Sequence, residues 1–290
     1  NSTTFTITAS GNRTMVAGHP VVFGGLMLSN GAVFGTDPAG LVIDQPVIIN
    51  NSSTGGFTGL YPITVNADLY KIQGGNDITL SNSLERGAVL TINGDYVSWQ
   101  NDSALTTRTL NIRGLGAGTV WNGVIRNGLS ANSNSRLSIS VPNSSFVRFE
   151  GASPNTHTGG VILYQGILEL AKVGALGTGT LELQGGAVTG AGGLVLTGAN
   201  RITNFVNLNG EATRFVGTDS IEVSGTVRNY NGNRFLHNDI SGAGTLNLTG
   251  GVQLSHDATN RILVMQGAGT TNISAPIVNS SSTATGSSLY

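Results

Sequence analysis

Short segments in which apolar and polar residues alternate recur along this chain, and they restrict its fold more than any other feature. In the second half they follow one another closely, at 161–163, 166–170, 180–183, 194–196 and 245–248. Alternation with a period of two is typical of a strand that buries one face. Glycine or asparagine bounds these segments, and both residues tolerate the positive φ of a tight corner. We therefore expect many short strands joined by sharp turns.

The composition also favours strands over helices. Of 290 residues, 43 are glycine, and valine, isoleucine and threonine are abundant. Glycine and β-branched residues lower helix propensity. Only 10% of the residues are charged while 39% are hydrophobic, and apolar clusters recur throughout. A chain of this kind can bury a core, unlike a disordered segment. We predict an all-β fold.

Three pairs of segments resemble one another along the chain. The segment 179–186 returns at 244–251, the segment 213–219 at 233–239, and the segment 199–202 at 259–262. The shifts within these pairs lie near multiples of one short repeat length. We predict a solenoid of parallel coils of about 20–22 residues, in which about 13 coils stack about 4.8 Å apart. Residues 1–290 would form one elongated unit, with less regular coils over 1–153, regular coils over 154–278 and a polar tail at 279–290.

An ordered set of motifs lies between residues 154 and 188. It consists of Asn-Thr-His-Thr-Gly-Gly at 155–160, Gly-Ile-Leu-Glu-Leu at 166–170, Gly-Ala-Leu-Gly-Thr-Gly at 174–179 and Leu-Glu-Leu-Gln-Gly-Gly at 181–186. Together these motifs resemble the autotransporter-associated β-strand repeat of bacterial secreted passenger proteins. His157 stands where that repeat usually has tyrosine, and Val161 stands where it has threonine.

The resemblance implies a right-handed parallel β-helix at, or released from, a Gram-negative-type cell surface after removal of a signal peptide. It leaves open whether the chain is a passenger fragment or a complete exported subunit.

Charge and composition exclude several partners. The net charge is −1 and the arginines are scattered, so we expect no nucleic-acid partner. No apolar run approaches the roughly 18 residues that span a bilayer. The chain has no cysteine, and its histidines (His19, His157, His237 and His256) lack the spacing of metal ligands. We expect no metal and no cofactor, and we interpret the histidines as solvated residues of coils or corners.

Two carboxylate pairs could in principle carry glycosidase chemistry, which needs two carboxyls within about 5–10 Å. Glu169 and Glu182 lie on consecutive segments, and Asp219 and Asp239 would be one coil apart. We interpret both pairs as structural, with nearby Arg214 and Arg234 balancing the aspartates. The glycines of 114–118 do not fit a nucleotide loop and are expected to form a corner. No enzymatic activity is predicted.

Trp99 and Trp121 are separated by one predicted coil length. On the outer face they would form an aromatic strip for glycan contact, and inside they would form a stack in the core. The sequence favours the core stack.

Three functions follow from this fold. The first is a self-assembling structural protein, because the ends of a solenoid carry unpaired backbone groups that can template another chain. The polar tail would fray unless a neighbouring subunit held it by strand addition. An adhesin that binds surface glycans and a polysaccharide-active enzyme are the alternatives. The candidate assembly residues are Thr3, Phe5, Ile7, Ile277, Val278, Leu289 and Tyr290.

Overall fold

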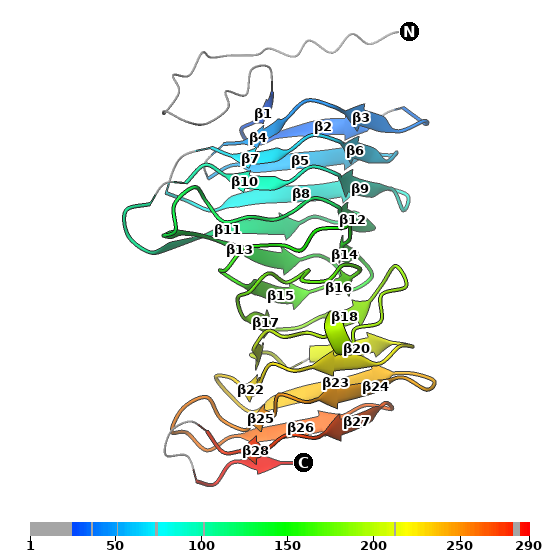
Figure 1. Ribbon diagram of the computed structural model, residues 1–290. Helices are drawn as coiled ribbons and strands as arrows, with labels where there is room; N and C mark the ends of the chain where they lie inside the picture. The colour runs from blue at the N-terminus through cyan, green and yellow to red at the C-terminus, as the bar shows by residue number, and fades with distance from the viewer. Residues whose placement is uncertain are drawn as a thin grey trace.

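The chain folds into a parallel β-solenoid. The computed structural model describes residues 25–35, 37–50, 52–72, 75–100, 102–211, 213–280 and 285–290. These residues form about 10 turns of about 25 residues each, and every strand pairing among them is parallel. Figure 1 shows the turns stacked in chain order from one end of the molecule to the other. The predicted all-β solenoid is confirmed; apart from a short 3-10 turn at Gly198–Asn200, the described residues contain no helix.

Two long sheets form two sides of the stack. Sheet B runs in the order β2 (Gly31–Gly35), β5 (Thr54–Gly59), β8 (Ile78–Leu84), β11 (Thr106–Arg113), β13 (Ser133–Ser140), β15 (Val161–Gln165), β17 (Leu181–Leu183), β19 (Val206–Leu208), β22 (Val227–Asn229), β25 (Val252–Gln253) and β28 (Ile277–Val278). Sheet C runs in the order β3 (Leu41–Ile43), β6 (Ile63–Val65), β9 (Val89–Ile92), β12 (Gly118–Trp121), β14 (Phe146–Phe149), β16 (Ile167–Leu170), β18 (Ala187–Gly190), β20 (Thr213–Gly217), β23 (Arg234–Ile240), β26 (Ile262–Gln266) and β29 (Ser288–Leu289).

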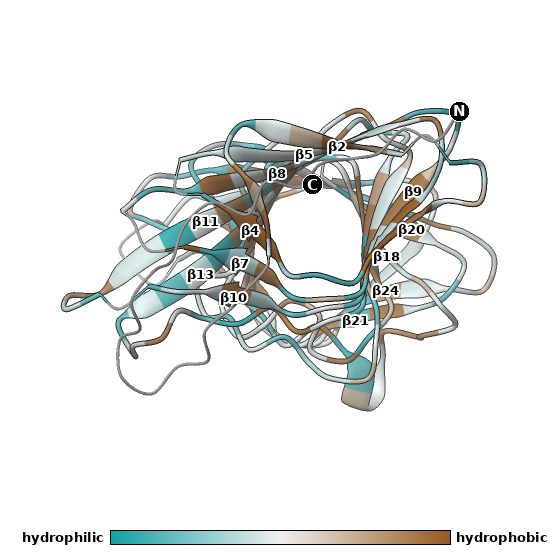
Figure 2. Ribbon diagram, turned by 90° about the horizontal axis from the view of Figure 1, so that it is seen from above, coloured by the Kyte–Doolittle hydropathy of each residue, from teal (hydrophilic) through white to brown (hydrophobic). Residues whose placement is uncertain are grey.

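Two shorter sheets complete the turns. Sheet A, in the first turns, contains β1 (Leu26–Leu28), β4 (Val47–Ile49), β7 (Leu69–Lys71) and β10 (Tyr96–Ser98). Sheet D, in the last turns, contains β21 (Ile221–Val223), β24 (Thr245–Leu248) and β27 (Thr270–Ile273). Figure 2 looks down the stack and shows the strands arranged around a common axis.

The core is built from side chains that repeat at the same place in successive turns. In sheet B one such column is fully buried: Leu110, Leu137, Val161, Leu181, Val206, Val227 and Val252. Burying an aliphatic side chain of this size contributes about 1.5–3 kcal/mol. Because each column member is covered by the turns on either side, a turn loses part of this burial wherever the stack stops.

The turns are longer, fewer and less uniform than predicted. They average about 25 residues and number about 10, so the predicted coil length was too short and the predicted number of coils too high. Leu181 pairs with Val161, whereas Leu110 pairs with Ile78, which is much farther away in the sequence. The corner loops account for most of this variation, and a register shift after Ile139 in the pairing of β13 with β15 adds one residue.

Of the three pairs of similar segments, only 213–219 and 233–239 lie on stacked neighbours, β20 and β23, and their register differs from the sequence alignment. Leu181 belongs to sheet B and Leu246 to sheet D, although they occupy equivalent places in one pair of similar segments. Thr213 pairs with Leu236 rather than with its sequence echo at residue 233. Ile202 bridges to Val223, while its echo at residue 262 lies in sheet C. Similar segments recur because every face needs the same alternation and the same corners.

Buried asparagines fix two corners, one between sheets B and C and one between sheets C and D. The Nδ2 of Asn82 donates to the Gly118 carbonyl oxygen at 2.7 Å, and the Leu84 N–H donates to Asn82 Oδ1 at 3.1 Å. Asn238 repeats this arrangement with the Thr270 carbonyl oxygen at 2.8 Å. The glycines of 114–118 form a corner, as expected, because a Cβ at residue 116 would collide with the Asn82 amide.

Candidate functional site

The last described turn of the stack contains β27, β28 and β29. β27, β28 and β29 pair with β24, β25 and β26 on one side and have no further strand partner among the described residues. Ile277 lies directly below Val252; Val252 is 1% exposed and Ile277 is 45% exposed. Val278 and Tyr290 are also exposed, at 46% and 71%. Four predicted assembly residues, including Leu289, therefore lie on this turn, and Thr3, Phe5 and Ile7 lie outside the described residues.

The end of the tail is held by the chain itself. Leu289 pairs with Leu263 in sheet C. The Ser288 N–H donates to the Arg261 carbonyl oxygen at 2.9 Å, and the Met265 N–H donates to the Tyr290 carbonyl oxygen at 2.7 Å. Residues 285–290 therefore do not fray, because they complete a rung of sheet C. A neighbouring subunit is not needed to order them.

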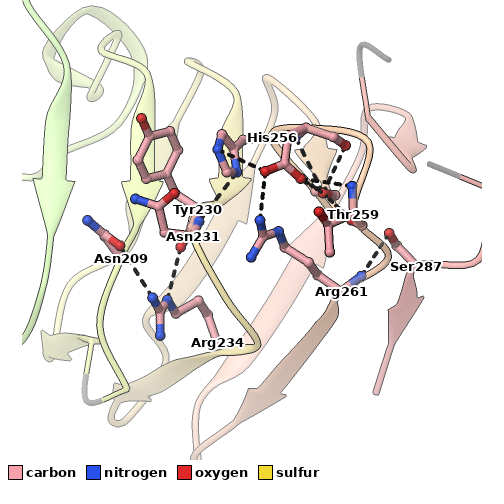
Figure 3. A network of polar contacts seen from close by, with 10 residues as sticks. Asn209, Tyr230, Asn231, Arg234, His256, Thr259, Arg261 and Ser287 are labelled. Atoms are coloured by element: carbon pink, nitrogen blue, oxygen red, sulfur yellow. Dashed lines mark hydrogen bonds and ion pairs between the residues drawn. The ribbon is translucent and has the colours of Figure 1, made fainter. Parts of the chain in front are cut away.

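A polar network links this turn to the turns above it, and Figure 3 shows its side chains. The His256 ring stacks against Tyr230 with 4.1 Å between centroids, and its Nδ1 accepts the Asn231 N–H at 3.3 Å. Asp257 lies 3.3 Å from His256 Nε2 and 2.7 Å from Arg261 Nη2.

The Asp257 carboxylate is committed to structural contacts. Hydrogen bonding from the Thr259 N–H, together with Arg261, holds its pKa far below the usual range. The hydroxyl that contacts it belongs to Ser255, which is buried and donates to the Thr259 carbonyl oxygen at 2.6 Å. Because both groups bind other residues of the same loop, the network anchors this loop.

The two tryptophans do not form the predicted stack. Trp121 is fully buried on β12, where its register neighbours are Ile92 and Phe149. Trp99 follows β10 on sheet A, is partly exposed, and packs its ring 5.2 Å from that of Tyr70. The turns in this region are longer than predicted, which places the two indoles on different faces. Trp121 cannot touch a glycan, whereas Trp99 and Tyr70 form an outer aromatic pair.

The two glutamates considered for catalysis are not a pair. Glu169, on sheet C, accepts a hydrogen bond from Arg148 at 2.6 Å, whereas Glu182, on sheet B, accepts one from Gln184 at 2.7 Å. The two carboxylates therefore belong to different faces of the solenoid, and each has its own polar partner.

The two aspartates are also separate. Asp239 binds Arg214 at 2.7 Å, but Asp219 lies in the bend that follows β20. Arg234 contacts Asn209 and the Tyr230 carbonyl oxygen rather than an aspartate, so its predicted balancing role is wrong. Within the described ranges, no three acidic or histidine side chains are grouped to hold a metal ion.

Sequence reasoning missed the buried titratable groups inside the stack, His157 and Lys172 among them. His157 is 0% exposed, neither ring nitrogen has a hydrogen-bond partner among the described residues, and burial lowers its pKa to about 4. Lys172 is buried nearby, donates to the Gly123 carbonyl oxygen at 2.7 Å, and has its pKa lowered by burial to about 8. The interpretation of His157 as a solvated residue is wrong. The tyrosine usual at this place in the resembling repeat was the available signal, since it indicates a large ring.

A groove of about 530 Å³ crosses the corners between sheets B and C in successive turns. Its walls are Thr58, residues 83–87, Leu115, Ala117 and residues 144–145. Glu85 and Arg86 are both exposed there and form no ion pair within the described part of the chain. No motif indicated this groove, because its walls come from segments that are a whole turn apart in the sequence.

No helix among the described residues is long and apolar enough to cross a membrane. No family model, curated protein or solved structure matches the chain.

Proposed function

We propose that this chain is a non-enzymatic structural protein of the bacterial cell surface or extracellular space, which assembles end to end through its terminal turns. The apolar face that the last described turn exposes is the observation that carries the proposal. Ile277 occupies the same column as fully buried residues of sheet B, yet nearly half of it is exposed. A second copy stacked in register would cover it as each turn covers the one before.

The backbone of the last turn supports the same partner. β27, β28 and β29 present the unpaired edges of three sheets at one end of the stack. A strand edge of this kind pairs readily with another chain. A second solenoid matches all three edges together, whereas a single extended peptide would match one.

The extracellular location rests on the resemblance at 154–188 to the autotransporter-associated repeat. The absence of enzymatic activity is supported by the placement of the carboxylates, since Glu169 and Asp239 are each bound to an arginine instead of facing a second carboxylate. Binding of glycans as an adhesin is the second candidate, and the outer aromatic pair Trp99 and Tyr70 favours it.

Negative-stain microscopy and sedimentation velocity over a concentration series test the assembly. A single copy of about 10 turns would be a rod on the order of 50 Å long. We expect longer rods at high concentration and their loss in Ile277→Lys. Val173→Lys is the matched control, because Val173 is 50% exposed but lies away from the end. Rods of single-copy length at every concentration would refute the proposal.

A further inference from the structure

The groove at the corners of sheets B and C has the chemistry of a ligand site. One turn of the chain contributes an exposed carboxylate and an exposed guanidinium, Glu85 and Arg86, side by side. Neither side chain has an ion-pair or hydrogen-bond partner in the described ranges, although many other charged side chains near the strands of this protein are paired. Their combined charge is zero, which favours neither a polyanion nor a simple cation.

Arg86 adopts a conformation that other residues adopt more easily. Its φ is +53° and that of Gly87 is +78°, and the Ala88 N–H donates to the Glu85 carbonyl oxygen at 2.9 Å. This is the pattern of a tight turn that prefers asparagine or glycine at the Arg86 position. A bulky residue held at positive φ is an outlier that points to a functional constraint. The turn holds the guanidinium at the groove with backbone strain that a glycine would avoid.

Hydroxyl groups and one apolar side chain complete the walls. The hydroxyls of Ser83 and Ser144 make no hydrogen bond to another residue of the described chain and can serve a ligand, whereas Ser145 is buried. Leu115 is 82% exposed, the most exposed large apolar side chain among the described residues. A ligand with an apolar face would gain by covering it, because apolar surface then leaves water.

We propose that this groove binds a short neutral saccharide of two to three units, lying along the solenoid axis. The arginine and glutamate would bind neighbouring hydroxyls of the sugar in a bidentate manner, Ser83 and Ser144 would bind further hydroxyls, and Leu115 would pack against the apolar face of a ring. The volume of about 530 Å³ lies within the range of small-ligand sites. This proposal is independent of end-to-end assembly, because the groove lies on the side of the stack.

Two variants and two matched controls test it. Arg86→Gly removes the side chain while suiting the positive φ, so the fold should remain at least as stable as the wild type. Asn231→Gly makes the same backbone change at φ +58°, away from the groove. Leu115→Ser removes the apolar wall, and Leu105→Ser removes a leucine that is 74% exposed elsewhere.

Binding is measured by saturation-transfer NMR and calorimetry on the full chain, with a panel of neutral di- and trisaccharides of different linkage and N-acetylation. We expect at least one sugar to bind and both groove variants to weaken it by about tenfold or more. Arg86→Gly loses one or two hydrogen bonds to the sugar, and Leu115→Ser loses the apolar contact with its ring. The two control variants should bind like the wild type. Absence of saturation transfer from every sugar at millimolar concentration, or equal binding by Arg86→Gly and the wild type, would overturn the proposal.

Discussion

Acid should weaken this fold through His157. Above pH 6.5 the imidazole is neutral in both the folded and the unfolded chain. Between pH 6.5 and about 4 the unfolded chain takes up a proton that the buried ring does not, so the free energy of unfolding falls across this window. Below about pH 4 both states are protonated and this loss is complete. A fall of the pKa from 6.5 to about 4 corresponds to roughly 3 kcal/mol.

The geometry explains why the proton is excluded. The ring is fully buried, and neither nitrogen has a partner in hydrogen-bond geometry among the described residues. The Ile125 backbone favours the protonated ring but offsets burial only in part, and the charge of Lys172 lowers the pKa further. Gly177 packs directly against the ring, where a Cβ would leave too little room. The imidazolium therefore cannot be stabilised without opening the turn.

Urea denaturation followed by circular dichroism at pH 7, 5.5 and 4 measures the effect. His157→Leu keeps an apolar side chain of similar size and cannot titrate, so its stability should fall by roughly 3 kcal/mol less than that of the wild type between pH 7 and 4. His237→Leu is the control, since His237 lies on the outer side and contacts Gln266. Identical pH profiles for the wild type and His157→Leu would refute the reasoning.

Three further predictions concern the core and the corners. Asn82→Ala should lower the free energy of unfolding by about 2–3 kcal/mol, because it leaves the buried Gly118 carbonyl without its donor. Asn238→Ala should cost less, about 1–2 kcal/mol, because its hydrogen bond to the Thr270 carbonyl oxygen is only partly buried. A loss below about 0.5 kcal/mol for Asn82→Ala in urea denaturation would contradict this. Gly210→Ala should lower the free energy of unfolding by at least about 3 kcal/mol, because the added Cβ would collide with the backbone of a neighbouring turn. Gly31→Ala is the control and should be nearly neutral in the same assay, because its Cβ would contact nothing. The free energy of unfolding of the wild type should rise between pH 8 and 10.5. In this range the unfolded chain binds a proton at Lys172 that the folded chain does not, and this advantage of the unfolded chain disappears as the pH rises. Lys172→Met should show a smaller rise in the same assay, and an equal rise would contradict the burial of Lys172.

Much of the local structure could be predicted from alternation alone. Residues 167–170 and 245–248 form β16 and β24, with apolar side chains inside. The prediction of parallel stacking is also confirmed. The candidate sites were less predictable. Ile277 and Val278 lie exposed on the last described turn, but Trp121 is buried beside residues that no spacing rule had connected to it.

The difference lies in what a single sequence encodes. Whether a side chain points inward depends on its neighbours along the same strand. The alternation at residues 161–163 therefore shows directly which of these side chains are buried. Which side chains meet across turns depends on the corner loops, which make the turn from Val161 to Leu181 short and the turn from Ile78 to Leu110 long. Each extra corner residue shifts every later contact, and similar segments then fall on different faces.

Alternation along the chain is therefore enough to predict the strands, their buried faces and the solenoid class. The register, the burial of His157 and Lys172, and the place of Arg86 and Leu115 in one groove follow only from how the turns stack. Alternation is a local property of the backbone, whereas stacking depends on contacts between residues a whole turn apart.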